Sequence, residues 1–228
     1  MATHLITGAG SGIGLTLGHR LLDRGDDLVL VARSAERADE LEELLPGSRV
    51  LVADLDRPSG IEAALGGRLP ERLDSLVHVA GVVDLGNVAD LPVGLLERQL
   101  AVNVAAPTEL TRLALPALRA ARGAVVFVNS GAGLHANPGW SAYAASKHAL
   151  RAVADSLRAE ESPNGVRVTS IYPGRTATPM QARVHEQEGK DYDPAKYIDP
   201  DTVASTILTA LDLPSDGLIT DLSVRPGV

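Results

Sequence analysis

Several residue types are scarce in this chain, and each scarcity excludes a class of chemistry or location. None of its 228 residues is cysteine, so neither disulfides nor thiolate chemistry are available to it. Aromatic residues make up only 3% of the chain, so alanine, leucine and valine must fill the core. No apolar run approaches the ~18 residues of a membrane span, and an apolar strand pattern already begins at about His4, which leaves no room for a cleavable signal. We therefore expect a cytoplasmic enzyme without a membrane anchor.

An excess of basic residues is also absent. The formal net charge is −8 and the isoelectric point is about 5.2, which argues against a nucleic-acid-binding surface. An anionic cofactor would therefore need basic residues placed locally around it. The length and the 45% of hydrophobic residues suit one large α/β domain. Because no repeat, linker or low-complexity run divides the chain, we predict a single domain over residues 1–228.

Short apolar runs rich in valine and leucine alternate with longer helical patterns. The runs that predict strands are His4–Ile6, Leu28–Ala32, Val50–Ala53, Leu76–Ala80, Ala124–Val128, Val166–Ile171 and Leu218–Val224. The patterns that predict helices are Ile13–Arg24, Ala35–Leu45, Ser59–Leu69, Val93–Ala121, Ala142–Glu161 and one near Pro200–Leu213. Continuous apolar strands indicate a sheet covered on both faces. We predict a Rossmann-type, doubly wound α/β fold with a mostly parallel sheet of about seven strands and helices on both faces.

The stretch Thr7–Gly14 has the pattern T-G-x-x-x-G-x-G between an apolar strand pattern and a helical one. Gly8 lets the chain leave the strand in a tight turn, and Gly12, without a Cβ, lets backbone N–H groups approach a pyrophosphate. Gly14 lets the helix pack close to the strand, and the helix N-terminus adds partial positive charge. This context favours a nucleotide site over a simple turn.

Arg33 follows the second predicted strand, where dinucleotide folds meet the adenosine ribose. The strand ends without a carboxylate for a ribose 2′-OH, whereas a guanidinium can bind a 2′-phosphate. The alternative is a solvated arginine at a helix start. Asp54, after the third strand, suits an adenine amino group and a turn cap equally well.

Two Y-x-x-x-K matches occur, Tyr143 with Lys147 and Tyr192 with Lys196. The first pair lies near the start of a strong helical pattern, where positions i and i+4 share one face. The second pair has Pro194 between its members, which disfavours a regular helix there.

Ser130 follows a predicted strand thirteen residues before Tyr143, and carboxyl ends of strands are where open α/β sheets place their chemistry. A turn serine is the alternative. Asn103 lies inside a predicted helix, where asparagine is either exposed or has a task. The connection Thr176–Asp199 is long enough to predict a substrate-binding loop.

In this order and spacing, the chain resembles the single-domain branch of the short-chain dehydrogenase/reductases over essentially its full length. The matching elements are Thr7–Gly14, Asp54-Leu55, Ala80-Gly81, Asn103, Ser130, the pair Tyr143 and Lys147, and Pro173–Thr178. The resemblance departs at His78-Val79, where the family usually has two asparagines before Ala-Gly. That departure puts local stability in doubt rather than the reaction, and we expect His78 to be a strand-end histidine with a structural bond.

The resemblance implies a catalytic tetrad of Asn103, Ser130, Tyr143 and Lys147. Tyr143 would be the general acid/base, Lys147 would lower the pKa of its phenol and bond the cofactor's ribose hydroxyls, and Ser130 would polarise the carbonyl oxygen. Asn103 would hold a water in a proton relay, and Thr178 would meet the nicotinamide carboxamide. The residues implied to bind the cofactor are Gly8, Ser11, Gly12, Ile13, Gly14, Arg33, Asp54, Leu55, Ala80, Gly81, Asn103, Tyr143, Lys147, Pro173, Gly174, Thr176 and Thr178. No metal is implied.

The expected function is hydride transfer between a nicotinamide and a carbonyl or secondary alcohol. Family members with arginine at the position of Arg33 tend to prefer NADP(H). NAD(H) dependence and a non-catalytic dinucleotide sensor are the alternatives, whereas a sugar-nucleotide epimerase is disfavoured by the glycine spacing.

We expect His135, Asn137, Trp140 and the loop Thr176–Lys196 to line the pocket of a small-molecule substrate that the sequence does not identify. That loop carries both charge signs and predicts no fixed anion clamp. Family members commonly pair the helices 95–118 and 144–157, so we expect a homodimer or homotetramer.

Overall fold

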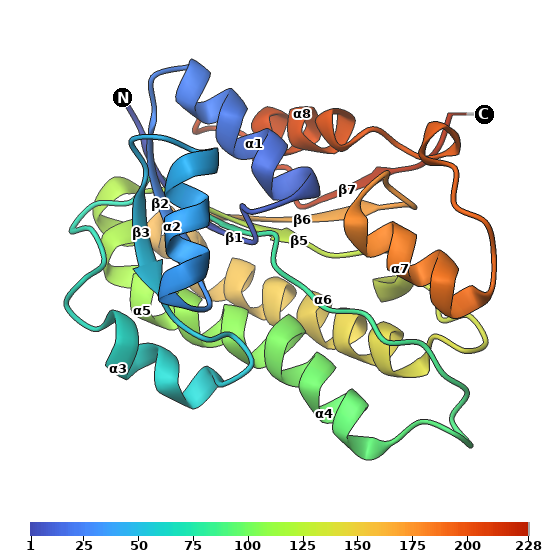
Figure 1. The fold of residues 1–228 in the computed structure, drawn as a ribbon. Helices are drawn as coiled ribbons and strands as arrows, with labels where there is room; N and C mark the ends of the chain where they lie inside the picture. The colour runs from blue at the N-terminus through green and yellow to red at the C-terminus, as the bar shows by residue number, and fades with distance from the viewer. Residues whose placement is uncertain (228) are drawn as a thin grey trace.

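Across residues 1–227, which the computed structural model describes, seven strands form one sheet in the order β3-β2-β1-β4-β5-β6-β7, and every neighbouring pair is parallel. Helices cover both faces of this sheet (Figure 1), so the predicted Rossmann-type, doubly wound fold is confirmed. The strands are β1 (Thr3–Thr7), β2 (Asp27–Ala32), β3 (Arg49–Val52), β4 (Ser75–His78), β5 (Ala124–Val128), β6 (Arg167–Pro173) and β7 (Asp221–Val224).

The helices follow the predicted patterns with three differences. They are α1 (Gly12–Asp23), α2 (Ala35–Leu44), α3 (Ile61–Leu65), α4 (Val93–Leu100), α5 (Ala106–Ala121), α6 (Ser141–Glu161), α7 (Pro179–Glu188) and α8 (Pro200–Leu211). The helix expected over 59–69 is a 3₁₀ turn at 58–60 followed by the five-residue α3. A π-helical turn, η2 (Ala101–Ala105), divides the helix expected over 93–121. None of the helices within residues 1–227 combines the length and apolarity that crossing a membrane requires.

Helix α7 lies inside the connection that we expected to be a loop. Thr178 begins it, because its hydroxyl accepts a hydrogen bond from the N–H of Gln181 at 3.3 Å. Pro179 occupies the first helical position, where its missing N–H has no partner to lose. The apolar periodicity of this short helix is weak. Only the N-cap Thr178 and Pro179 mark its start in the sequence.

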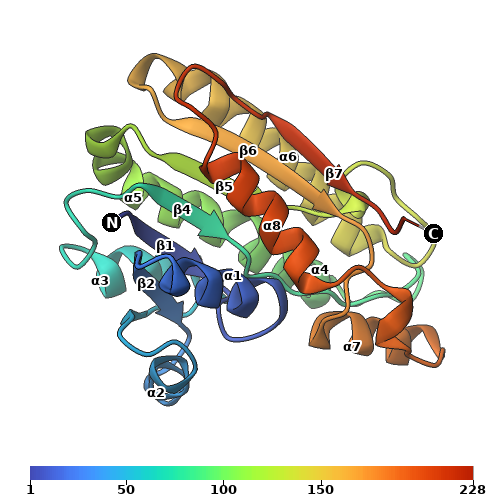
Figure 2. The same ribbon diagram turned by 90° about the horizontal axis from the view of Figure 1, so that it is seen from above.

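Successive residues of the inner strands face opposite layers of helices. In β1, Leu5 packs into the core beneath α3, α5 and α6, whereas Ile6 packs into the core beneath α1, α2 and α8. In β2, Val31 likewise packs into the first of these cores and Leu30 into the second. Because both faces are covered, these strands need apolar residues at every position, and they therefore read as continuous apolar runs. Figure 2 shows α1 and α8 side by side over one face.

The strand order reverses between β1 and β4. The chain runs from β1 outward through β2 to β3, and then returns to β4 on the other side of β1. Connections that leave in opposite directions open a crevice at the carboxyl ends of the strands. The glycine turn follows β1, Ala80-Gly81 follows β4, and Ser130 follows β5, so the topology gathers these segments at one edge of the sheet.

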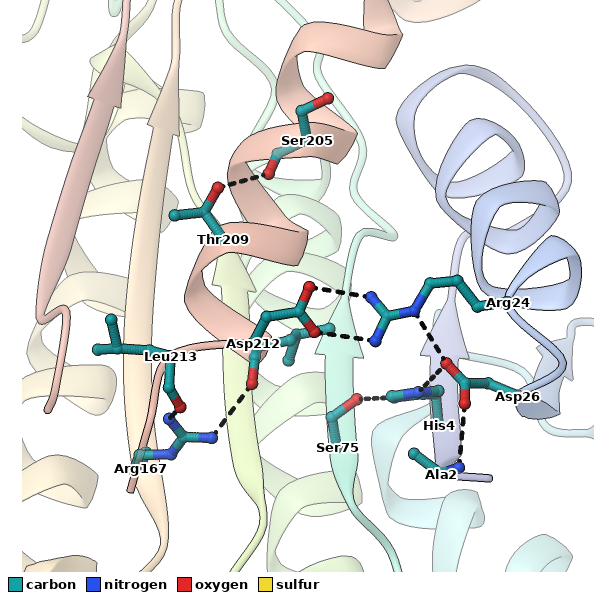
Figure 3. A network of polar contacts seen from close by, with 11 residues as sticks. Ala2, His4, Arg24, Asp26, Ser75, Arg167, Ser205, Thr209, Asp212 and Leu213 are labelled. Carbon is teal, nitrogen blue, oxygen red and sulfur yellow. Dashed lines mark hydrogen bonds and ion pairs between the residues drawn. The ribbon is translucent and has the colours of Figure 1, made fainter. Parts of the chain in front are cut away.

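A polar network joins strands and helices at the opposite edge of the sheet (Figure 3). His4 Nδ1 lies 2.7 Å from Ser75 Oγ, and His4 Nε2 lies 3.4 Å from a carboxylate oxygen of Asp26. Arg24 contacts Asp26 at 3.4 Å and donates to both carboxylate oxygens of Asp212 at 3.1 and 2.9 Å. The serine, histidine and aspartate resemble a hydrolase triad in order. Ser75 is only 1% exposed, however, so a substrate cannot reach its hydroxyl. The network instead connects α8 to the sheet, because Arg24 bridges Asp26 and Asp212.

His78, the departure noted in the sequence, has the expected structural bond. Its Nε2 lies 2.9 Å from the hydroxyl of Thr111 on α5, and its ring stacks on Phe127 with a centroid separation of 5.0 Å. The imidazole is 4% exposed, and burial lowers its pKa to about 3. The ring is therefore neutral in the folded protein at neutral and mildly acidic pH.

The burial of His78 predicts acid sensitivity. Below a pH of ~6.5, the unfolded chain binds a proton at this ring that the folded chain refuses until about pH 3. The free energy of unfolding should therefore fall by about 1.4 kcal/mol for each pH unit below 6.5 because of this group. We expect His78→Gln, whose amide can still reach Thr111, to make the pH dependence shallower in urea unfolding between pH 6.5 and 5. The control is His19→Gln, at an exposed position. Equal slopes in the wild type and His78→Gln would contradict this account.

Candidate active site

The turn between β1 and α1 has a backbone that glycine makes possible. Gly8 has a φ of +75° and Gly12 a φ of +51°, both in the left-handed region. A Cβ on Gly8 would lie 2.6 Å from the backbone nitrogen of Ala80, and a Cβ on Gly12 would lie 2.8 Å from Cγ2 of Thr178. Without these side chains, the turn at the N-terminus of α1 packs closely against Ala80 and Thr178, two segments that the sequence also singled out.

A cavity of about 1080 Å³ connects this turn with the predicted catalytic residues. The predicted site residues in its wall are Gly8, Ser11, Gly12, Ile13, Ala80, Gly81, Ser130, Tyr143, Lys147, Pro173, Gly174, Thr176 and Thr178. The predicted substrate-pocket residues His135, Asn137 and Trp140 also line it. The remaining predicted residues, Gly14, Arg33, Asp54, Leu55 and Asn103, lie outside this wall. One cavity therefore reaches most of the predicted cofactor, catalytic and substrate positions.

Tyr143 and Lys147 lie one turn apart near the start of α6. Lys147 Nζ lies 5.8 Å from the centroid of the Tyr143 ring and donates a hydrogen bond to the carbonyl of Val128 at 3.1 Å. Both side chains are buried, with exposed fractions of 7% for the tyrosine and 4% for the lysine. Burial raises the pKa of the Tyr143 phenol, while the neighbouring Ser130 hydroxyl acts in the opposite direction. Burial also lowers the pKa of Lys147 to about 8.

Ser130 begins a short turn, η3 (Gly131–Gly133), and its hydroxyl accepts a hydrogen bond from the N–H of Ala132 at 3.1 Å. The buried side chain of Asn129 holds this segment against α6. Its carbonyl oxygen accepts from the N–H of Ser130 at 2.9 Å, and its amide donates to the carbonyl of Lys147 at 3.1 Å. Sequence reasoning missed Asn129, although an asparagine at a strand end directly before Ser130 was a visible signal.

Asn103 is 1% exposed and lies in the π-helical turn η2. Its amide donates to the carbonyl of Val82 at 2.9 Å and to the hydroxyl of Ser146 at 3.0 Å, while its oxygen accepts from the N–H of Val82 at 2.9 Å. Ser146 in turn donates to the carbonyl of Tyr143 at 2.8 Å. Of the two alternatives for an internal asparagine, the exposed one does not apply, because Asn103 is buried and links the segment after β4 to α6. A Cβ on Gly81 would lie 3.2 Å from the Asn103 oxygen and 3.7 Å from Lys147 Nζ.

Two arginines lie near the start of α2. Arg33 is exposed directly after β2. Arg37, which sequence reasoning missed, donates from Nη2 to the carbonyl of Gly10 at 2.9 Å and also pairs with Glu40. The spacing of the two arginines around a helix start was the available signal. Asp54 accepts from the N–H of Asp56 at 3.0 Å, as a turn-capping aspartate does, and its second carboxylate oxygen lies 3.7 Å from Arg57.

The second tyrosine and lysine pair does not share a helix. Pro194 begins a single 3₁₀ turn, η5 (Pro194–Lys196), after Tyr192. The Tyr192 ring stacks on Tyr197 with centroids 5.8 Å apart, and Lys196 contacts Asp193 at 3.7 Å. The arrangement agrees with the interpretation that this match to the motif is incidental.

The segment that contains α7 is tied to Tyr143 through side chains. Arg175 donates to both carboxylate oxygens of Glu188 at 3.0 and 2.6 Å, which fixes the end of α7. The Arg175 guanidinium carbon lies 5.8 Å from the Trp140 ring centroid, and that ring meets Tyr143 edge-on at 5.9 Å. His185, buried on α7, contacts the Tyr197 hydroxyl at 2.6 Å. Within residues 1–227, no group of three or more His, Asp or Glu side chains is arranged to hold a metal ion.

Known proteins resemble this chain over nearly its whole length. The family model described as short chain dehydrogenase matches residues 2–189. Dehydrogenase/reductase SDR family member 7B of Xenopus tropicalis is 32% identical over 246 residues, which cover 98% of this chain and 80% of that protein. The solved structure of an actinorhodin polyketide ketoreductase with NADPH has a TM-score of 0.87 and 25% identity, covering 99% of this chain and 96% of the other. A 3-ketoacyl-(acyl-carrier-protein) reductase from Brucella melitensis with NADH has a TM-score of 0.83 and 23% identity, covering 99% and 97%.

Proposed function

Because the chain belongs to the short-chain dehydrogenase/reductase family, we propose that it is an NADP(H)-dependent oxidoreductase that interconverts a carbonyl compound and a secondary alcohol. The observation that carries the proposal is the convergence of Ser130, Tyr143 and Lys147 in the wall of a cavity that also reaches the glycine turn. A bound nicotinamide would supply the hydride for reduction or accept it in oxidation. The residues of the chain would supply binding, orientation and the proton.

The residues around the glycine turn fit a dinucleotide. The glycine turn lines the cavity at the N-terminus of α1, where backbone N–H groups and the helix dipole favour a pyrophosphate. Ala80-Gly81, Pro173-Gly174 and Thr178 border the same cavity. These residues would hold the cofactor between the turn and the catalytic side chains, and Lys147 would bond its ribose hydroxyls.

The acid–base assignment rests on the position of Tyr143 in the cavity wall with Ser130 and Lys147, and its protonation state fits that role. A phenol whose pKa is raised by burial keeps its proton at neutral pH, so Tyr143 can donate it to an oxygen that becomes an alkoxide during reduction. In oxidation the same residue must lose that proton first. Lys147, whose pKa is about 8, still carries mostly positive charge at pH 7 and would stabilise the phenolate. Ser130, beside the phenol, would hydrogen-bond the substrate oxygen and polarise the carbonyl.

Asn103 would act mainly by positioning. Both hydrogens of its amide are used by Val82 and Ser146, which leaves one lone pair of its oxygen for a water. Its proposed place in a proton relay rests on this lone pair and on its closeness, across Gly81, to Lys147.

The preference for NADP(H) rests on this chain's own residues, because the solved relatives hold either NADPH or NADH. Arg33 is exposed at the end of β2, with no carboxylate at Ala32 to receive a ribose 2′-OH. Arg37 donates to the carbonyl of Gly10 and pairs with Glu40, which offsets part of its charge, so it would assist Arg33 only as a second contact.

The test is to follow the nicotinamide absorbance of purified protein with NADPH or NADH over a panel of ketones, aldehydes and secondary alcohols. We expect turnover of at least one carbonyl class with NADPH. Absence of turnover across the panel, together with absence of cofactor binding by calorimetry, would overturn the proposal.

We also propose that the chain forms a homodimer or homotetramer through the helices α4, α5 and α6. Segments 95–118 and 144–157 carry more alanine and leucine than one buried face needs, and symmetric pairing through a two-fold axis is the common solution for such helices. Light scattering at micromolar concentration should give a multiple of the 23.8 kDa chain mass. A monomer mass would contradict the proposal.

A further inference from the structure

The wall of the cavity carries a charge opposite to that of the whole protein. The chain has 21 lysines and arginines against 29 aspartates and glutamates. Glu188 is nevertheless the only acidic residue in this cavity wall within residues 1–227, whereas its basic residues are Lys147, Arg175, Arg183, Lys190, Lys196 and Arg225. Such a local excess of positive charge in a concave site attracts anions.

Most of these cations already have partners. Arg175 and Lys190 both contact the carboxylate of Glu188, Lys196 contacts Asp193, and Lys147 is assigned to the chemistry. Arg183 and Arg225 are different, because neither has a carboxylate within 4.0 Å among the described residues.

Arg225 is held beside the catalytic serine by the segment that carries it. The carbonyl of Val224 accepts from the N–H of Gly174 at 2.7 Å, and the Pro226 ring lies 3.2 Å from the place that a Cβ on Gly174 would take. The Arg225 guanidinium carbon lies 3.2 Å from the place of a Cβ on Gly131, the residue after Ser130. Arg225 therefore borders the cavity that Ser130 and Tyr143 also line.

The cofactor has its own anion sites elsewhere. The pyrophosphate is assigned to the glycine turn, and a 2′-phosphate is assigned to Arg33 and Arg37 beyond it. Arg225 comes from the other end of the chain, after β7, and approaches the cavity past Gly131 and Gly174. The loop 176–199, whose sequence predicts no anion clamp, contributes Arg183 from α7.

We propose that the substrate carries an anionic oxygen group, a carboxylate or a phosphate ester, and that Arg225 binds it while the carbonyl lies at Ser130 and Tyr143. Arg183 adds positive charge to the same cavity. The inference rests on the proposed oxidoreductase function and names its substrate class. A guanidinium suits this role because its planar N–H donors match two oxygens of either group.

Binding can be tested without turnover, because Trp140 is the one tryptophan of the chain and lies in the cavity wall. With saturating NADP⁺ present, a ketone binds but cannot be reduced. Tryptophan fluorescence titrations would compare pyruvate, levulinate and 5-oxohexanoate with their methyl esters, and dihydroxyacetone phosphate with dihydroxyacetone. We expect the anionic member of at least one pair to bind at least about tenfold more tightly, as a charged hydrogen bond implies. The advantage should shrink as salt is added.

The variant Arg225→Gln should reduce the ratio of anionic to neutral affinity in that pair by about tenfold. The ratio is measured within one variant, so a partly destabilised protein does not distort it. The matched control is Arg68→Gln, an exposed arginine between α3 and β4, which should keep the wild-type ratio. Arg225→Lys keeps the positive charge but lacks the planar guanidinium that can donate to two oxygens at once. It should therefore give an intermediate ratio of anionic to neutral affinity.

Equal or tighter binding of the neutral member in every pair would overturn the anionic substrate class. An unchanged ratio in Arg225→Gln would overturn the role of this arginine. Neither result depends on turnover, so these outcomes stay separate from the NADPH assay that tests the oxidoreductase function itself.

Discussion

Tyr143→Phe should reduce kcat by about 10²- to 10⁴-fold, the usual contribution of a positioned acid–base group. The phenylalanine ring keeps the edge-on contact with Trp140 and the packing of a side chain that is 7% exposed, so the fold should persist. Only the hydroxyl that donates and accepts the proton is lost. Initial rates with NADPH and the best carbonyl of the panel give kcat, and calorimetry gives the cofactor affinity, which should stay near that of the wild type.

The chain contains a matched control for this change. Tyr192→Phe alters the other tyrosine of a Y-x-x-x-K match, whose ring stacks on Tyr197 and whose hydroxyl is not assigned to the reaction. Its kcat should be nearly unchanged. If Tyr143→Phe keeps substantial activity, or if the two variants lose activity equally, the assignment of Tyr143 as the acid–base residue is wrong.

Arg33→Ala should weaken NADPH by about 10- to 150-fold in kcat/KM and leave NADH nearly unaffected. This range corresponds to one charged hydrogen bond of about 1.5–3 kcal/mol. A 2′-phosphate carries about −1.5 to −2 charges near neutral pH. Because the protein has a net charge of −8, local contacts rather than long-range attraction must bind that group. The wild type should favour NADPH over NADH by at least about tenfold.

Arg33→Asp should extend the effect, because a carboxylate there repels the 2′-phosphate as well as removing its partner. The position is exposed, so the charge has no burial penalty, and Arg68→Ala serves as an exposed control far from the cofactor. Steady-state kinetics with both cofactors decide the matter. An equal loss with NADPH and NADH in Arg33→Ala would show that the arginine supports the turn instead of selecting the cofactor.

The sequence was sufficient wherever a feature depends on residues close together in the chain. The strand runs were readable because burial on both faces demands continuous apolar residues, as Leu5 and Ile6 show. The glycine turn was readable because Gly8 and Gly12 adopt a φ that other residues avoid. The spacing of Tyr143 and Lys147 was readable because one helical turn separates them.

Features that depend on contacts between distant segments required the tertiary structure. The internal helix α7 follows from a cap and a proline in a segment with little periodicity, so its pattern alone did not predict it. Arg225 lies far along the chain from Ser130, and only the pairing of β7 with β6 brings it beside Gly131. Asn129 and Asn103 are short polar residues whose partners lie on α6 and after β4.

The sequence by itself therefore determined the doubly wound sheet, the glycine turn and the spacing of Tyr143 and Lys147, because short-range periodicity and backbone geometry are encoded locally. The tertiary structure alone decided the environment of those side chains. The lowered pKa of His78 and Lys147 and the raised pKa of Tyr143 come from burial, which depends on what packs over each group. The excess of positive charge in the cavity has the same origin, because it is the fold that gathers Arg175, Arg183 and Arg225 from separate elements of an acidic chain.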